Sequence, residues 1–433
     1  MNHARVMTAK VGDIRASRTM GSHSLGSLSR TTVLIASTLL LGASSPSVHS
    51  RPSAARVTPL RSPAGPGSQV PNLAIMPDGR VVMSWIEPLR DRGLALLCAS
   101  FDGQKWSQPA TIAAGDSFFV NWADFPSIRP LGGQRLAAHW LWRSGSGTYA
   151  YDVRVSQSEN GGRTWTQPIT PHRDGTATEH GFASLASAGD AVLALWLDGR
   201  KTVGHDEASS GPMPDMTLRA ASVESDGQLR DEVEIDGRTC DCCQTAAVTT
   251  DRGILVAYRD RSPDEVRDIC VARWQKGQWS RPELVHADNW HIAGCPVNGP
   301  AMDARRSHVA ITWYTAAADT PRVYVAFSED AGETFGPPTR IDEGNPLGRV
   351  HVALLADGSA LATWIEASGR DAVIRTRRIP VHGPMGVPVT VTRTSAARAS
   401  GCPRVVSLGD AVLFAWTEAG TTPRVRVATM SIK

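Results

Sequence analysis

Five of the seven cysteines fall in three short segments, where they could bind a metal ion or form disulfides. Cys240, Cys242 and Cys243 stand within four residues, and Cys295 and Cys402 each occupy a Gly-Cys-Pro triplet. Thiolates with nearby imidazoles suit Cu(I) or Zn, and the same connections carry His180, His291 and His351. In an oxidising compartment the thiols would instead form disulfides, with Cys295 and either Cys242 or Cys243 as the favoured pair. The spacing fits no standard metal motif, so both interpretations stay open.

A second group of residues offers the chemistry of glycan binding and hydrolysis. The run Tyr258-Arg259-Asp260-Arg261 combines a phenol, a carboxylate and two guanidinium groups. A guanidinium can donate two parallel hydrogen bonds to a substrate carboxylate, and a carboxyl group can act as general acid or base. These four residues are therefore the predicted catalytic set. The predicted substrate-binding residues are Arg349, Arg404, Asp198 and Trp290.

Five carboxylates, two of them named above, share one position, two residues after the aromatic that ends an apolar strand. Because side chains alternate along a strand, each carboxylate should lie on the same side as its aromatic, at the rim of the fold. They could cap loops and pair with local arginines, or form a ring of general acids and bases. The five residues are Glu87, Asp198, Asp260, Glu366 and Glu418.

A repeated strand pattern positions all of these residues. The unit is a short strand, a tight turn, an apolar strand ending in an aromatic, and two further strands, and it recurs about every 50 to 60 residues. The aromatics are Trp85, Trp140, Trp196, Tyr258, Trp313, Trp364 and Trp416. Four-stranded units of this period form the blades of an all-β fold, the β-propeller. The sequence predicts seven blades, with strand 56–60 completing the last blade beside 424–430.

Two octapeptides of one pattern follow third strands of this repeat. Residues 158–165 read SENGGRTW and residues 328–335 read SEDAGETF, with weaker copies at 100–106 and 225–227. Asn or Asp can bond its own backbone in such a turn, Gly accepts the positive φ, and the closing aromatic is expected to pack between strands. The pattern resembles the Asp-box, or BNR repeat, of the sialidase superfamily. For residues 56–433 the resemblance implies a propeller; sialidases usually have six blades, so a six-bladed fold is the alternative.

The resemblance also implies a chemistry. Sialidases bind the substrate carboxylate with three arginines, use a Tyr–Glu pair as nucleophile and use an Asp as acid and base. The run 258–261 matches this set by residue type only. The family's Arg-Ile-Pro motif has no counterpart here, and the nearest string is SIRP at 127–130. An exo-sialidase-like glycoside hydrolase is therefore implied if the chain is an enzyme, and whether it is one stays open.

The long connections should all lie on one face of a propeller, opposite the octapeptides, and long loops on a rigid scaffold usually carry function. They span residues 114–123, 173–182, 198–216, 236–244 and 286–299. The five clustered cysteines are expected near the mouth of the channel on this face. Cys402 should stay unpaired or join a metal site with one of the three histidines. Cys98 and Cys270 lie in third strands and are expected to be buried, inert thiols.

The N-terminal sequence and the net charge limit the cellular location and the class of partner. Residues 1–50 read as a signal peptide with an N-terminal extension: basic residues end at Arg30, an apolar run spans 31–42, and cleavage is expected near residues 43–50. The mature chain, 51–433, is predicted to be one propeller domain, secreted or periplasmic, with no transmembrane segment. The net charge of +3 and the lack of a basic stripe argue against a nucleic-acid partner.

Together these features predict an exported, monomeric β-propeller that binds a glycan or another small ligand at the mouth of the long-loop face and could hydrolyse it. No cofactor is certain. The alternative is a non-enzymatic periplasmic protein built around the cysteines, which binds copper or zinc or serves as a protein-interaction platform.

Overall fold

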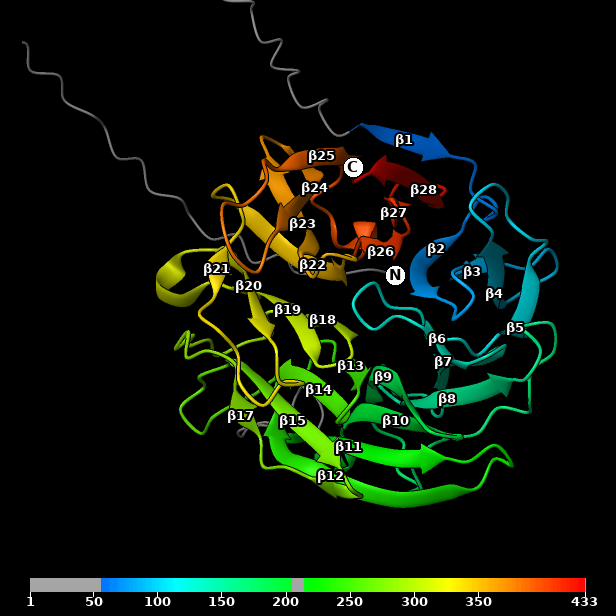
Figure 1. Ribbon diagram of the computed structural model, residues 1–433. Helices are drawn as coiled ribbons and strands as arrows, with labels where there is room; N and C mark the ends of the chain where they lie inside the picture. The colour runs from blue at the N-terminus through cyan, green and yellow to red at the C-terminus, as the bar shows by residue number, and fades with distance from the viewer. Residues whose placement is uncertain (1–55, 205–213, 433) are drawn as a thin grey trace, which may run out of the picture. The chain divides into compact units, whose positions relative to one another are not determined.

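The computed structural model describes residues 56–204 and 214–432, which belong to one compact unit and form seven antiparallel sheets around a common axis (Figure 1). Each sheet is one blade of a β-propeller. The predicted count of seven is confirmed, and the six-bladed alternative is wrong. The predicted signal peptide at 1–50 lies outside the described residues.

In blades 1 to 3 the strands run from the axis outward in chain order (Figure 1). Blade 1 consists of β2 (Gln69–Ile75), β3 (Val81–Pro88), β4 (Leu94–Phe101) and β5 (Ala110–Gly115). Blade 2 consists of β6 (Ser127–Gly132), β7 (Arg135–Arg143) and β8 (Tyr151–Ser158). At the place of its fourth strand a single bridge joins Val155 to Ile169. Blade 3 consists of β9 (His180–Ala188), β10 (Ala191–Asp198), the 3-10 turn η1 (Arg200–Thr202), β11 (Met216–Val223) and β12 (Leu229–Thr239).

Blades 4 to 6 follow the same plan. Blade 4 consists of β13 (Ala246–Thr250), β14 (Gly253–Arg259) and β15 (Ile269–Gln275), with two short segments beside β15, β16 (Gln278–Trp279) and β17 (Glu283–Leu284). Blade 5 consists of β18 (Ala301–Arg305), β19 (His308–Thr315), η2 (Ala317–Asp319), β20 (Arg322–Ser328) and β21 (Thr339–Arg340). Blade 6 consists of β22 (Pro346–Leu354), β23 (Ala360–Ser368), β24 (Asp371–Ile379) and β25 (Val389–Thr394).

Blade 7 closes the ring with strands from both ends of the described chain. It consists of η3 (Arg398–Ser400), β26 (Arg404–Leu408), β27 (Ala411–Glu418), β28 (Arg424–Ser431) and β1 (Val57–Leu60). Strand β1 pairs antiparallel with β28, so that Val57 faces Met430 and Leu60 faces Val427. The predicted closure is therefore confirmed, and it pairs two strand edges that would otherwise be open.

The apolar core lies between neighbouring blades. Seven clusters of buried side chains occupy the seven blade interfaces. Each aromatic of a second strand belongs to the cluster shared with the preceding blade: Trp196 of blade 3 packs against blade 2, and Trp85 of blade 1 packs against blade 7. All seven predicted aromatics are buried. The aromatic recurs once per blade because each blade needs one large ring to fill its interface with the preceding blade.

The octapeptides form tight turns at which polar side chains bond the backbone. In the second copy the Ser328 hydroxyl donates to Asp330 at 2.7 Å and accepts from the Gly332 amide at 2.8 Å, and the Thr334 amide and hydroxyl both donate to Asp330. Phe335 is half-buried against the cluster between blades 4 and 5, as expected for the closing aromatic.

Loop order assigns the two faces. In antiparallel blades the first-to-second and third-to-fourth turns share one face, and the second-to-third loops and the blade connections share the other. The octapeptides therefore lie opposite the long loops, which carry the candidate residues. Among the described residues, no helix has the length and apolar character needed to span a membrane.

Candidate functional site

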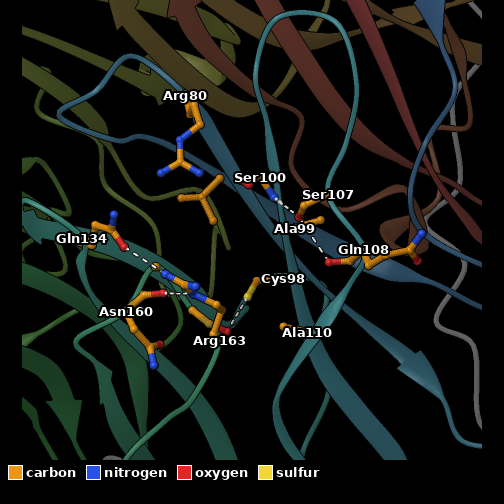
Figure 2. Close-up of a pocket in the computed structure, with 13 residues that line it drawn as sticks. Arg80, Cys98, Ala99, Ser100, Ser107, Gln108, Ala110, Gln134, Asn160 and Arg163 are labelled. Carbon is orange, nitrogen blue, oxygen red and sulfur yellow. Dashed lines mark hydrogen bonds between the residues drawn. The ribbon is translucent and has the colours of Figure 1, made fainter.

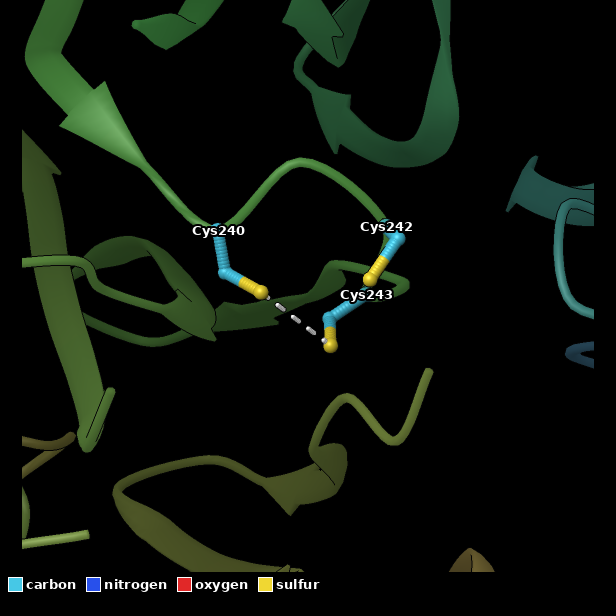
Figure 3. A group of neighbouring side chains, drawn as sticks. All are labelled: Cys240, Cys242 and Cys243. Carbon is cyan, nitrogen blue, oxygen red and sulfur yellow. Dashed lines mark hydrogen bonds between the residues drawn. The ribbon is translucent and has the colours of Figure 1, made fainter. Parts of the chain in front are cut away.

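Three cysteine sulfurs converge at the entry to blade 4 (Figure 3). Cys240, Cys242 and Cys243 follow β12 directly, and their sulfurs all lie within 4.8 Å of one another. The sulfurs of Cys240 and Cys243 are 3.6 Å apart. Cys240 and Cys243 are buried, whereas Cys242 is half-buried, so the group is reached from its Cys242 side.

Cys295 joins this group from the next connection. It is exposed and approaches Cys242, but its sulfur is not one of the three that lie within 4.8 Å of one another. The two connections touch because Gly299 lies directly against the backbone of Gln244, where a Cβ atom would not fit, and its amide donates to Oε1 of Gln244 at 3.0 Å. The predicted approach of Cys242 and Cys295 is therefore seen. All seven cysteines are free thiols, and the predicted disulfide stays a prediction.

Positive charge surrounds the sulfurs. The Arg267 guanidinium donates to Sγ of Cys240 at 3.3 Å. Hydrogen bonds from Cys242 and Cys243, followed by the charges of Arg267 and Arg259, hold the pKa of the Cys240 thiol well below its ordinary value. Burial, with the Cys240 thiolate as the second cause, raises the pKa of Asp241 to about 6. The cluster therefore favours a thiolate at Cys240, the form that binds metal ions.

Cys402 stands apart from this group. Burial raises the pKa of its thiol, against the opposing effect of the charges of Arg404 and Arg349. It is not among the described cysteines whose sulfurs lie within 4.8 Å of one another. Cys98 and Cys270 are buried as predicted, and burial raises the pKa of Cys98 to about 12.

The predicted catalytic run lies beside the cysteines but is largely occupied. The Tyr258 hydroxyl donates to Asp236 at 2.5 Å. Arg259 is 1% exposed and donates to the backbone oxygens of Asn298, Arg267 and Tyr314. These bonds leave Arg259 bridging blades 4 and 5.

The other two members of the run are less constrained. Arg261 pairs with Glu265 at 2.7 Å and lies 3.5 Å from Asp241. Burial raises the pKa of Asp260 to about 6. Asp260 can therefore still act as a proton donor, and Arg261 supplies a positive charge near the cysteine group.

The predicted substrate-binding arginines are also used in packing. Arg349 stacks on Trp122 at 4.7 Å and donates to the carbonyls of residues 396 and 397. Arg404 stacks on Phe125 at 3.8 Å. Trp290 is buried under Arg259, 4.9 Å from its guanidinium. Two rings of the loop 121–125 thus pack on arginines of blades 6 and 7. These contacts do not gather the predicted arginines around one substrate.

The carboxylates that follow the strand aromatics do not form a catalytic ring. Glu87, Asp198 and Glu366 each accept the indole N–H of the tryptophan two residues before, at 2.9, 2.7 and 2.6 Å. Asp198 also pairs with Arg200, and Glu418 is exposed and pairs with Arg426. These four carboxylates therefore bond neighbouring tryptophans and arginines, which is the structural role that the sequence analysis gave as the alternative to catalysis.

One buried acidic group on the long-loop face was missed by the sequence analysis. The Tyr151 hydroxyl donates to Glu179 at 2.6 Å and to Asp124 at 3.1 Å. Burial raises the pKa of Glu179 to about 7 and that of Asp124 well above its ordinary value. The three residues come from three separate elements and share no motif, so only the fold unites them.

The histidines occupy three different settings. His180 is fully buried and stacks on His172 at 3.8 Å between ring centres. His291 is exposed, with Nδ1 3.3 Å from the Asp264 carbonyl oxygen. His351 lies by the channel, where its Nδ1 accepts from the Val405 amide. No contact between any of these three histidines and Cys402 is found among the described residues.

A separate cavity of about 370 Å³ lies between blades 1 and 2 on the octapeptide face (Figure 2). Its walls include Arg80, Cys98 and the turn 160–163 of the first octapeptide. The Gly161 amide donates to the Gln134 carbonyl at 2.9 Å, so the octapeptide turn is anchored to the first turn of its own blade. No carboxylate lines it, which separates it from the acidic, thiol-rich long-loop face.

No family model matches the chain, and no curated protein matches it either. Solved structures share its fold. A lectin from Burkholderia pseudomallei superposes with a TM-score of 0.58 at 13% identity, covering 84% of this chain and 96% of the lectin. A sialidase from Streptococcus pneumoniae gives 0.44 at 12% identity over 90% and 72% of the two chains, and one from Trypanosoma rangeli gives 0.45 at 12% over 75% and 56%. At 13% identity the likeness to the lectin shows the fold alone.

Proposed function

We propose that this propeller binds a soft metal ion, Cu(I) or Zn(II), through Cys240, Cys242, Cys243 and Cys295. The observation that carries the proposal is the 3.6 Å separation of the Cys240 and Cys243 sulfurs. Two thiolates on one tetrahedral ion, with metal–sulfur bonds of about 2.3 Å, stand about 3.8 Å apart. The sulfurs therefore need to move only slightly to share one ion. Exposed Cys295 would supply the last ligand and the route of entry.

The surrounding charges support the same proposal. Several thiolates on one monovalent or divalent ion leave a net negative charge, which is costly to bury without compensation. Arg267 donates to Cys240, and Arg259 and Arg261 lie nearby to offset that charge. A lowered pKa at Cys240 also reduces the competition between protons and the metal at neutral pH.

The test is metal content and thiol count on the full protein, purified anaerobically. We expect one thiolate-bound copper or zinc per chain, and we expect chelation to raise the number of fast-reacting thiols. Cys240→Ser and Cys243→Ser should lower affinity at least tenfold. Cys98→Ser and Cys270→Ser, at buried thiols in third strands, are the matched controls and should leave it unchanged. A metal-free chain in which two or four thiols are lost to disulfides would contradict the proposal.

A second candidate is glycan binding at the same face. It is favoured by carboxyl groups that titrate near neutrality, Glu179, Asp241 and Asp260, close to Arg261. Such groups can donate and accept hydrogen bonds with sugar hydroxyls and can act as general acids. The lectin that shares the fold makes a carbohydrate ligand a reasonable first probe.

This candidate is tested by a glycan array and by turnover of sialosides and neutral glycosides. Binding that is lost in Asp260→Asn and Arg261→Met but kept in Cys240→Ser would establish it independently of the metal. Turnover lost in Asp260→Asn would add hydrolysis, whereas binding without turnover would make the protein a lectin. If no glycan binds and none is hydrolysed, the candidate is excluded.

A further inference from the structure

A second group of potential ligands lies between blades 2 and 3, and it has a different chemistry from the cysteines. His172 comes from the connection after the first octapeptide and His180 opens β9. Their rings stack almost parallel, 8° apart, at 3.8 Å. Asp152 of β8 approaches both rings. The side chains of His172 and His180 are 4% and 0% exposed.

Asp174 fixes which ring nitrogens carry protons. Its Oδ1 lies 2.7 Å from Nδ1 of His172, and its Oδ2 lies 3.2 Å from Nε2 of His180. An ionised carboxylate only accepts hydrogen bonds, so both of these nitrogens donate. In neutral rings the other nitrogen of each histidine is therefore a bare lone pair.

Those two lone pairs face a third acceptor. Nε2 of His172 and Nδ1 of His180 have no hydrogen-bond partner among the described residues, although both atoms are buried. They lie 3.6 and 3.7 Å from one oxygen of Asp152, Oδ1, and all three atoms are within 4.8 Å of one another. Three acceptors that meet without a donor repel one another, and buried acceptors of this kind require a partner.

We propose that His172, His180 and Asp152 bind a divalent transition metal ion of the Zn(II) class. Two imidazole nitrogens and one carboxylate oxygen suit such borderline ions better than Cu(I), which prefers sulfur. Ligands about 2.0–2.2 Å from one ion stand about 3–3.5 Å apart, so the two nitrogen–oxygen distances of 3.6 and 3.7 Å need to close by only a few tenths of an ångström. Asp174, which donates no ligand, is the positioning residue that orients both imidazoles.

The charges around the group also favour a cation. Asp198 lies 3.7 Å from Nε2 of His180, so three carboxylates surround the two rings. Arg200 offsets part of this charge through Asp198 at 2.7 Å and Asp174 at 3.7 Å. Asp152 is 14% exposed and opens the group to solvent. A divalent ion would bring the group close to neutrality.

The test uses Co(II) and Zn(II) on the full chain carrying both Cys240→Ser and Cys243→Ser, which removes two of the four proposed sulfur ligands. We expect one Co(II) per chain, with visible ligand-field bands and no thiolate-to-cobalt charge-transfer band. His172→Gln should weaken binding about 100-fold, and Asp174→Asn about 10–100-fold, since it removes only the orienting partner. Because this background lacks the proposed thiolate site, the outcome is independent of the cysteine proposal.

The matched control is His286→Gln. His286 bonds Asp288 through Nδ1 at 2.9 Å, as His172 bonds Asp174, but it lacks a stacked histidine, so its loss should leave affinity unchanged. If His172→Gln does not fold, Asp152→Asn removes the charged ligand with little change of shape and should weaken binding at least tenfold. Unchanged affinity in the folded ligand variant, equal loss in the control, or no Co(II) bound overturns the proposal.

Discussion

The indole Nε1 of Trp196 donates a hydrogen bond of 2.7 Å to Oδ2 of Asp198, two residues further along β10. Trp85 with Glu87 and Trp364 with Glu366 repeat this arrangement. In each case the ring fills the interface with the preceding blade, where the indole N–H would otherwise be buried without a partner. The carboxylate therefore serves packing: it allows a tryptophan, the largest side chain, to occupy that interface.

This pairing predicts a stability effect. Glu366→Ala leaves the buried N–H of Trp364 unpartnered, along with the amides of Glu343 and Asn345. We expect a loss of about 2–3 kcal/mol in the free energy of unfolding. Glu418→Ala, which removes an exposed ion pair, should cost less than about 1 kcal/mol. Denaturant titrations of both variants check the difference, and equal losses would disprove the role given to the pair.

The octapeptide turn makes a second stability prediction. Asp330→Ala removes the carboxylate that accepts from Ser328 and from both polar groups of Thr334. A loss of about 1–3 kcal/mol is expected in thermal or denaturant unfolding, because these bonds hold the turn closed. Its neighbour Glu329 is exposed, and Glu329→Ala is the control. A variant at Asp330 as stable as that control would refute a structural role.

A third prediction concerns the Cys240 thiol. Arg267→Met removes the guanidinium that donates to Cys240 Sγ, one of the causes of its low pKa. The pKa should rise, so less thiolate is present at pH 7 and metal affinity at that pH falls, while the variants converge at high pH. Thiolate ultraviolet absorbance against pH measures the shift. Arg273→Met, at an arginine paired with Glu283 and the Gly332 carbonyl, should have no such effect.

A fourth prediction concerns pH and stability through Glu179. Burial raises the pKa of Glu179 to about 7 in the folded protein, above the ordinary value of 4.5. The folded state therefore binds the proton more tightly than the unfolded state, and this contribution to stability is present below pH 4.5 and is lost as the pH rises towards 7. Glu179→Gln should flatten the fall in melting temperature between pH 5 and 8. The exposed Glu159→Gln should follow the wild type, and an identical slope in both variants would argue against the shift.

The fold could be predicted because its determinants are periodic. Each of the seven second strands carries an aromatic that fills the interface with the preceding blade. The number of blades can therefore be counted from the regular spacing of these aromatics in the sequence. The pairing of β1 with β28 was predictable for a similar reason, since a last blade with three strands and a leading strand without a partner need each other. Burial of Cys98 and Cys270 followed from their places in third strands.

The site was less predictable because its contacts cross between blades. The sequence marked Cys240, Cys242 and Cys243 as a group, and the neighbouring connection brings Cys295 towards Cys242 alone. It could not reveal that Arg259 bonds backbone oxygens of the next blade, since carbonyls leave no mark in a sequence. Nor could it pair His172 with His180, because the sequence analysis assigned His172 no role.

The junction of β1 with β28 has a consequence for the time course of biosynthesis. Of the described strands, β1 leaves the ribosome first and β28 last, so the ring cannot close until the whole propeller has been translated. Bringing together segments this far apart in the chain costs conformational entropy equivalent to a free energy on the order of 5 kcal/mol. The preformed blades reduce this cost because they hold the two strands near each other. A prematurely terminated chain would keep an unpaired edge, and cellular proteases could recognise it as unfinished. The closing strand pair can therefore form only after β28 has been translated.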